Sequence, residues 1–220
     1  MTADIKVEHE FWQVNGIRMH VAVAGAGRPI VLLHGFPEFW YSWRYLMPRL
    51  AEQFRVIAPD LRGYGQTQIP DGGYDLDNLA KDTAELIEQV GKPALVVGHD
   101  WGGVIGWHLA TAYPDHVVGY VTAAGPHPAR YLELLRTSPR QFVMSLYTVF
   151  FQIPLLPEWL LSRNRGALLV RTMKRSAARP DAFSDADLEQ YRNEWARREA
   201  VRAGLNYYRQ MGRRPVEISR

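Results

Sequence analysis

The stretch Gly98-His99-Asp100-Trp101-Gly102-Gly103 decides the fold of this chain. The apolar run of residues 94–97 leads into it, and residues 104–112 continue from it as a segment of helical character. Where a strand turns sharply into a helix, the residues beside the apex must be very small, because larger side chains would collide with the returning backbone. The sequence therefore predicts a strand, a tight turn with Asp100 at its apex, and a helix.

The side chain at the apex determines the chemistry that we expect. A carboxylate such as that of Asp100 needs no base to deprotonate it before it attacks. It is a poor nucleophile towards acyl carbonyls, because the mixed anhydride that forms is high in energy. It is suited to displacement at an sp³ carbon, which forms an alkyl ester that a second step hydrolyses. We therefore predict that Asp100 is the nucleophile of a two-step hydrolysis.

Strands and helices are expected to alternate over the first half of the chain. Asn15-Gly16 joins two runs of strand character in a predicted β-hairpin. Further strands are expected at residues 29–33, 54–59, 94–97 and 116–123, and helices at about 43–52, 76–90 and 101–113. This order predicts the α/β class, with a mostly parallel, doubly wound sheet of six strands that starts with the antiparallel hairpin. The loops at 34–38 and 60–65 then meet Asp100 beyond the carboxyl ends of the strands.

The second half of the chain carries helical signals only. Helices are expected from Ser138-Pro139 to about residue 151, from Pro157 onwards, and from the capping-box residues Ser184 and Asp187 towards Met211. We interpret this block as a lid over the site; the alternative is a second, packed helical layer. The predicted domains are a core at residues 1–125, a helical cap at 126–215 and the start of a further core segment at 216–220.

The composition excludes several classes of site. The chain contains no cysteine, which rules out disulfides, thiol catalysis and cysteine-based zinc sites. It has neither an H-E-x-x-H motif nor a G-x-G-x-x-G motif with a suitably spaced acid, so we expect no metal and no cofactor. The first twelve residues lack the apolar core of a signal peptide, and no stretch approaches membrane-spanning length. We therefore expect a cytoplasmic protein without membrane insertion.

The charge is unevenly distributed. Residues 163–220 hold 14 Lys and Arg against 7 Asp and Glu, a net charge of +7, while the rest hold 12 against 16, a net charge of −4. Basic segments of this kind can bind nucleic acid or acidic lipid. Acids and arginines alternate at residues 189–194, however, which is typical of a solvated helix face. We expect such a face here and no nucleic-acid partner.

Three separated motifs, HGFPEFWYSWR (34–44), DLRGYGQT (60–67) and GHDWGG (98–103), resemble the epoxide-hydrolase family of the α/β-hydrolase superfamily. The resemblance covers essentially the whole chain and implies the α/β-hydrolase fold with a helical cap. It also implies an oxyanion hole made by the backbone N–H groups of Phe36 and Trp101, with Pro37 after a cis peptide bond. The side chain of His34 is expected to hold its loop by hydrogen bonds.

The resemblance further implies two cap tyrosines that donate to the epoxide oxygen as the ring opens. They fall on Tyr147 and Tyr208, and Tyr207 is the alternative to Tyr208. The chemistry requires such donors, because an alkoxide is a poor leaving group at neutral pH and a phenol of pKa about 10 can protonate it. The expected partners are a small apolar epoxide and water. The apolar character follows from aromatic and aliphatic cap residues: Phe142, Phe150, Phe151, Leu155, Leu156 and Trp159.

The family's remaining catalytic residues, an acid and a histidine, belong to strand–helix units that follow the cap. Of the seven histidines, His127 alone is expected at the right edge of the sheet, and its flanking prolines favour a hinge. We therefore expect a C-terminally truncated family member that lacks the last strand–helix units. In such a chain the second step of the reaction would stall, and the exposed strand at 116–123 would favour self-association.

Two other functions stay open. Haloalkane dehalogenases share the nucleophilic aspartate and the tryptophan after it, but they need a side-chain donor at the position that Phe36 occupies. Alternatively, the chain is a catalytically inactive fragment that binds apolar ligands under its cap. Serine-type ester hydrolysis is disfavoured because the apex residue is an aspartate.

Overall fold

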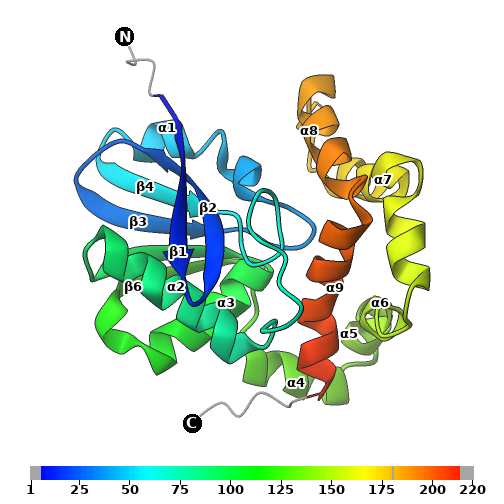
Figure 1. The fold of residues 1–220 in the computed structure, drawn as a ribbon. Helices are drawn as coiled ribbons and strands as arrows, with labels where there is room; N and C mark the ends of the chain where they lie inside the picture. The colour runs from blue at the N-terminus through cyan, green and yellow to red at the C-terminus, as the bar shows by residue number, and fades with distance from the viewer. Residues whose placement is uncertain (1–5, 180, 214–220) are drawn as a thin grey trace.

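A six-stranded sheet with the strand order β1-β2-β4-β3-β5-β6 forms the first part of the molecule in this computed structural model (Figure 1). The structure describes residues 6–179 and 181–213. The strands are β1 (Glu8–Val14), β2 (Ile17–Ala24), β3 (Arg28–Leu33), β4 (Phe54–Pro59), β5 (Ala94–His99) and β6 (Val117–Ala123). β2 is antiparallel to both β1 and β4, whereas β4, β3, β5 and β6 run parallel. The predicted α/β class and mostly parallel sheet are confirmed.

The hairpin between β1 and β2 turns where the sequence predicts. Asn15 and Gly16 have φ angles of 42° and 76°. Two successive positive φ angles are the requirement of the type I′ turn, which matches the twist of paired strands. This turn sets the register of the antiparallel start of the sheet, with Val14 opposite Ile17.

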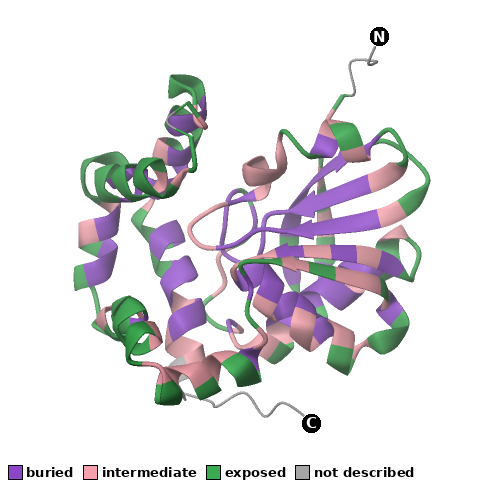
Figure 2. Ribbon diagram, turned by 180° about the vertical axis from the view of Figure 1, so that it is seen from behind, coloured by how far each residue is buried: buried purple, intermediate pink, exposed green. Residues whose placement is uncertain are grey.

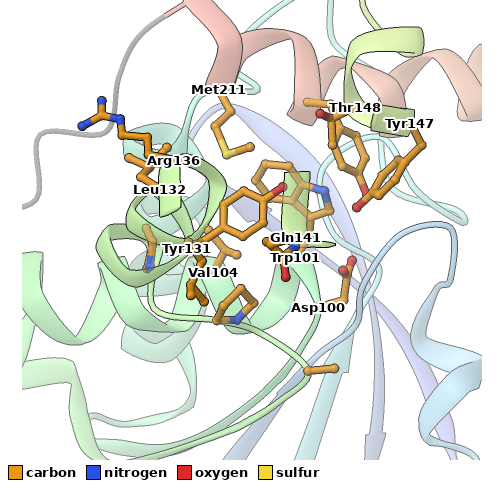
Figure 3. A pocket seen from close by; sticks show the side chains of 15 residues that line it. Asp100, Trp101, Val104, Tyr131, Leu132, Arg136, Gln141, Tyr147, Thr148 and Met211 are labelled. Carbon is orange, nitrogen blue, oxygen red and sulfur yellow. The ribbon is translucent and has the colours of Figure 1, made fainter. Parts of the chain in front are cut away.

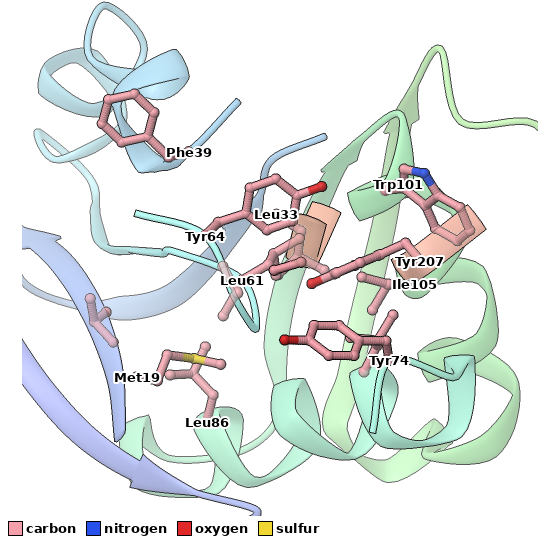
Figure 4. Close-up of a cluster of buried hydrophobic side chains, with 14 of the residues drawn as sticks. Met19, Leu33, Phe39, Leu61, Tyr64, Tyr74, Leu86, Trp101, Ile105 and Tyr207 are labelled. Atoms are coloured by element: carbon pink, nitrogen blue, oxygen red, sulfur yellow. The ribbon is translucent and has the colours of Figure 1, made fainter. Parts of the chain in front are cut away.

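The parallel strands are buried on both faces. On β3, Val31 and Leu33 belong to one apolar cluster, and Ile30 and Leu32 belong to another on the opposite face. Figure 4 shows the first cluster, in which Leu86 and Ile105 come from helices that pack on the sheet. Alternating side chains point to opposite faces of a strand, so an uninterrupted apolar run is what a doubly covered strand requires.

Two helices cover the face of this first cluster, namely α2 (Leu76–Val90) and α3 (Trp101–Ala112). α2 begins as predicted at Asp75, whose side chain accepts a hydrogen bond from the Asn78 N–H at 3.1 Å. The helix expected at about 43–52 is wrong in its extent. The 3₁₀-helix η1 (Trp40–Trp43) is followed by the short α1 (Met47–Leu50), because Pro48 lacks the N–H that a helix continuing from residue 43 would need.

Helices alone make up the cap, as predicted. They are α4 (Pro128–Thr137), α5 (Pro139–Met144), α6 (Leu146–Phe150), α7 (Leu156–Ser176), α8 (Asp185–Trp195) and α9 (Arg198–Arg213). In Figure 1 they stand beside the sheet, and α9 lies between the sheet and α5, α6 and α7. Among the described residues, no helix combines the length and apolarity that crossing a membrane requires.

Two cap helices are shorter than the sequence predicts. The helix expected from Ser138 to about 151 breaks at Ser145, a buried residue whose hydroxyl is bonded by Tyr131 and Gln141. The hydroxyl of Thr148 also donates to the Ser145 carbonyl at 2.7 Å, and a side-chain donor to the backbone competes with the helical pattern. The run expected from 184 to 211 breaks between α8 and α9, where Trp195 and Arg197 donate to backbone carbonyls of the core. In each case contacts outside the helix determine the break.

The boundary between core and cap at residue 125 stays a prediction, and the segment 216–220 lies outside the described residues. β6 is an edge strand of the sheet, and its Val118 and Val121 are exposed by 49% and 61%. Self-association through this edge stays a prediction as well.

The turn from β5 into α3 is possible only with small residues around it. A Cβ on Gly102 would lie 2.1 Å from the carbonyl oxygen of Leu33, and one on Gly98 would lie 2.3 Å from that of Gly102. Both neighbours are backbone atoms, which cannot rotate away as the end of a side chain can. α3 therefore packs against β3 and β5 at a distance that a methyl group would increase.

We expect Gly102→Ala to lower the free energy of unfolding by about 3 kcal/mol, because the new methyl group must push α3 away from β3. The matched control is Gly72→Ala, at a site where a Cβ would meet no atom within 4 Å. This control is expected to change stability by less than about 0.5 kcal/mol. Urea unfolding of both variants measures the difference, and equal stabilities would contradict the packing argument.

Candidate active site

Asp100 sits at the apex of the turn in a conformation that side chains rarely adopt. Its φ is 51° and its ψ is −115°, which is a strained combination for a residue other than glycine. Its N–H donates to the carbonyl of Ala123 at 3.1 Å, and its own carbonyl accepts from the N–H of Val104 at 3.0 Å. A Cβ on Gly35 would lie 2.5 Å from the Cβ of Asp100, so glycine lets the loop after β3 approach the carboxylate.

Backbone N–H groups hold the carboxylate of Asp100. The N–H of Phe36 donates to Oδ2 at 2.9 Å, and the N–H of Trp101 also bonds the carboxylate. Burial raises the pKa of Asp100, and these two hydrogen bonds act in the opposite direction and favour the ionised form. The peptide bond between Phe36 and Pro37 is cis. The structure thus brings together Asp100, Phe36, Trp101 and Pro37.

Two tyrosines of the cap line the same cavity as Asp100. Tyr147 comes from α6 and Tyr208 from α9, and their ring centres lie 5.9 Å apart. The Trp101 ring packs edge-on against the ring of Tyr208, with the ring centres 5.1 Å apart. The Tyr147 and Tyr208 hydroxyls are close enough for each to influence the pKa of the other. Figure 3 shows the Tyr147 hydroxyl turned towards the carboxylate of Asp100. Two phenols and one carboxylate therefore converge on one space.

Both phenols stay protonated at neutral pH. Burial and then the negative charge of Asp100 raise the pKa of Tyr147 to about 12. The same two causes raise the pKa of Tyr208 well above its usual value. Each hydroxyl is therefore available as a proton donor over the physiological range.

Tyr207 lies elsewhere. Its hydroxyl donates to the carbonyl of Arg62 at 2.8 Å, and its ring packs on Tyr64, Tyr74 and Trp101 in the core. It is fully buried, whereas Tyr208 lines the cavity. The sequence could not separate these neighbours, because the rotation of α9 about its axis decides which of them faces Asp100.

The cavity has a volume of about 560 Å³ and is lined mainly by apolar side chains. Val104, Leu132 and Met211 supply much of this lining, and Gln141 and Thr148 add polar groups. Figure 3 places Leu132 and Met211 on the side away from Asp100. The space suits a small apolar molecule with its reacting end at the carboxylate. This apolar character was predicted from the wrong residues, because none of those six cap side chains lines the cavity: Phe142, Phe150, Phe151, Leu155, Leu156 and Trp159.

No histidine lines this cavity among the residues that the structure describes. His34 bonds the carbonyl of Gly35 at 3.0 Å and the N–H of Leu61 at 2.9 Å, which confirms that it holds its loop. His99 bonds Glu38 at 3.1 Å. His127 precedes α4, and its ring packs against Trp107 with the centres 4.9 Å apart. These three side chains are engaged away from the Asp100 carboxylate.

Cap residues that the sequence did not single out clamp the cap onto the core. Glu194 accepts a hydrogen bond from the N–H of Gly65 at 3.0 Å, and Arg197 donates to the carbonyl of the same Gly65 at 2.6 Å. Trp195 donates to the carbonyl of Pro37 at 2.6 Å. The clamp thus fixes both the glycine loop after β4 and the loop that carries Phe36.

The solvated helix face expected at residues 189–194 is wrong at Glu194, which is 8% exposed. Burial raises the pKa of Glu194 to about 7, against the lowering effect of Arg197. Alternation of charges is a local pattern and cannot reveal that one acid faces another part of the chain. At the other end of α8 the carboxylate of Asp187 binds Arg44 at 2.6 Å and accepts from the hydroxyls of Tyr41 and Tyr45. Burial acts to raise the pKa of Asp187, but hydrogen bonds from Ser184, Arg44 and Tyr41 lower it overall.

The family described as alpha/beta hydrolase fold matches residues 28–201. The chain belongs to this family. An AB hydrolase superfamily protein of Bacillus subtilis, YfhM, is 40% identical over 209 residues, which are 92% of this chain and 73% of that protein. Human epoxide hydrolase 4 is 37% identical over 204 residues, or 89% of this chain and 56% of the human one. The chain thus spans little more than half the length of this human relative.

A crystal structure of the Bacillus megaterium epoxide hydrolase in complex with an inhibitor superposes on this α/β hydrolase with a TM-score of 0.86 and 32% identity. The match covers 91% of this chain and 71% of that one. Together with the relatives in sequence, it places the chain among the epoxide hydrolases of the α/β-hydrolase superfamily, as the three motifs predicted.

We expect Glu194→Gln to alter how the stability of this α/β hydrolase depends on pH. Folding raises the pKa of this carboxyl group from its ordinary value of about 4.5 to about 7. The folded state therefore loses stability as the pH rises from about 4.5 to about 7. The glutamine variant still accepts from Gly65 but does not ionise. Between pH 4 and pH 8, the free energy of unfolding of the variant is expected to rise by about 3 kcal/mol relative to that of the natural protein.

Thermal unfolding at the two pH values measures this effect. Glu189→Gln is the matched control, because Glu189 lies on the same helix with half of its side chain exposed. That variant is expected to follow the natural protein at both pH values. If the stability of Glu194→Gln showed the same pH dependence as that of the natural protein, Glu194 would not titrate with a raised pKa.

Proposed function

We propose that this chain opens apolar epoxides through an ester on Asp100. The observation that carries the proposal is that the carboxylate and the hydroxyls of Tyr147 and Tyr208 converge in one largely apolar cavity. Membership of the epoxide-hydrolase family supports it. The proposed substrates are small apolar epoxides, with water as the second reactant.

In the first step, the free oxygen of the carboxylate attacks one ring carbon while Oδ2 stays bonded to the Phe36 N–H. A bond forms between this oxygen and the carbon, and the bond between that carbon and the ring oxygen breaks. The electron pair goes to the ring oxygen, which takes a proton from Tyr147 or Tyr208. The product is a hydroxyalkyl ester on Asp100, and the phenolate regains its proton from solvent.

In the second step, water must attack the ester carbonyl. The N–H groups of Phe36 and Trp101 are positioned to stabilise the negative charge that develops on the carbonyl oxygen. A base must take a proton from that water. No described histidine lines the cavity, so we propose that the 220-residue chain forms the ester faster than it hydrolyses it.

Haloalkane dehalogenation remains the second candidate. The side chain of Phe36 has no donor for a departing halide. The paired phenols suit an oxygen leaving group instead. Release of bromide from 1-bromobutane without ester formation from an epoxide would favour the dehalogenase.

We expect incubation with styrene oxide to add the mass of one epoxide to the intact chain. Asp100→Ala removes the nucleophile and should give no adduct. Tyr147→Phe and Tyr208→Phe should each slow adduct formation by about 10- to 100-fold, because one of two donors is lost. Tyr207→Phe is the matched control and should leave the rate unchanged.

Intact-mass spectrometry with time gives these rates, and digestion followed by peptide mapping locates the adduct. Rapid, repeated release of the diol would contradict the stalled second step. Binding of styrene oxide without any adduct would identify the chain as an inactive ligand-binding fragment.

The rate of adduct formation should also depend on pH in a defined direction. Attack requires the ionised carboxylate, and burial raises the pKa of Asp100 above its ordinary value. The rate is therefore expected to fall on the acid side, with a midpoint above the ordinary pKa of an aspartate. It should stay level from neutral pH to about pH 9, because the phenols remain protonated there. A midpoint below that ordinary value would contradict the raised pKa of the nucleophile.

A further inference from the structure

Exposed apolar side chains gather on one part of the cap. Of the 16 large hydrophobic residues that are exposed in the described chain, 11 lie between residues 142 and 168. One of them is Tyr147, which faces the cavity, and the others belong to α5, α6, the turn after α6 and α7. We call these ten residues the outer cap surface: Phe142, Val143, Met144, Leu146, Val149, Ile153, Leu155, Leu156, Trp159 and Leu168. The most exposed are Val143 and Val149, each by 63%, and Leu155, by 66%.

This surface faces away from the sheet. Figures 1 and 2 show α5, α6 and α7 on the outer side of the cap, where exposed residues predominate. The core therefore does not cover these side chains. Exposed large apolar side chains concentrated in this number on one segment mark an interaction surface.

The charged residues of the elements that carry this surface, from the start of α5 to the end of α7, are almost all positive. Residues 139–176 contain six exposed cations: Arg140, Arg163, Arg165, Arg171, Lys174 and Arg175. They contain one acid, Glu158, which is buried and bonded to Arg209 at 2.7 Å. Arg165 pairs with Glu189 of α8, and the guanidinium of Arg163 lies 4.9 Å from the centre of the Trp159 ring. No acid of this segment is exposed.

Apolar side chains bordered by cations match the chemistry of an anionic lipid surface. The apolar groups enter the boundary between head groups and acyl chains, and the cations bind the negative head groups. A tryptophan at such a boundary, here Trp159, suits an environment with one apolar and one wet side. A second copy of this chain would instead bring two positively charged surfaces together.

We propose that the outer cap surface binds the cap peripherally to anionic lipid membranes, without any helix crossing the bilayer. The binding does not depend on the reaction proposed for Asp100. It affects how a substrate reaches the cavity, however, because α5 and α6 contribute both to the lining of the cavity and to the outer cap surface. Gln141 and Thr148 line the cavity, and the next residues, Phe142 and Val149, are exposed on the outer cap surface. An apolar molecule dissolved in lipid is therefore close to the cavity that contains Asp100.

The test is sedimentation of the full 220-residue chain with vesicles, in the absence of any epoxide. The chain is expected to bind vesicles of equal parts phosphatidylcholine and phosphatidylserine at least about fivefold more tightly than vesicles of phosphatidylcholine alone. High salt should weaken the binding to the anionic vesicles, because it screens the cations. Equal binding to both vesicles, or no binding to either, would overturn the proposal.

The variant Val143→Glu with Val149→Glu places two negative charges on the outer cap surface at exposed positions, where folding is not disturbed. It is expected to lose vesicle binding by at least about tenfold. The matched control is Val118→Glu with Val121→Glu, which alters exposed valines of β6 and should bind as the natural chain does. Circular dichroism confirms that both variants fold.

Unchanged vesicle binding by the cap variant would overturn the proposal. So would a vesicle-free dimer of the natural chain that the cap variant dissociates in gel filtration, since a second copy would then occupy the surface. The adduct measurement with styrene oxide remains a separate readout, so failure of lipid binding and failure of the reaction are distinguishable.

Discussion

The close approach of three backbone segments at Asp100 is the constraint on which the rest of the structure depends. Gly98 and Gly102 let β5 turn straight into α3, and Gly35 lets the loop after β3 touch the carboxylate. The same geometry forces a positive φ on Asp100 and directs the N–H groups of Phe36 and Trp101 at its side chain. The close packing of these backbone segments thus imposes the strained conformation of Asp100, and it also brings the N–H groups within reach of the carboxylate.

The cap completes the site through polar contacts with the loops of the core. Glu194 accepts from the N–H of Gly65, Arg197 donates to the carbonyl of Gly65, and Trp195 donates to the carbonyl of Pro37. On α9, Arg209 bonds the carbonyls of Phe151 and Ile153, which ties this helix to the end of α6. Because Tyr147 and Tyr208 come from these two helices, the distance between the phenols depends on contacts within the cap.

Local patterns predicted much of the fold and less of the cap. Asn15-Gly16, the cap of α2 at Asp75 and the apolar run of β3 were predictable, because turn chemistry, capping and strand burial depend on neighbouring residues. The breaks at Ser145 and before α9 were not predictable, since they depend on hydrogen bonds to distant residues. The sequence also assigned Glu194 to a solvated face, although it packs against the core.

By itself, the sequence determined the turn at Asp100, the alternation of strands and helices, and a carboxylate rather than a hydroxyl at the apex. These features depend on residue size, periodicity and the type of side chain, which are all local. Only the tertiary structure decided that Tyr208 rather than Tyr207 shares a cavity with Asp100, and that the exposed apolar residues of the cap lie on its outer side. Both depend on how each helix is rotated against its neighbours, and packing between distant segments sets that rotation.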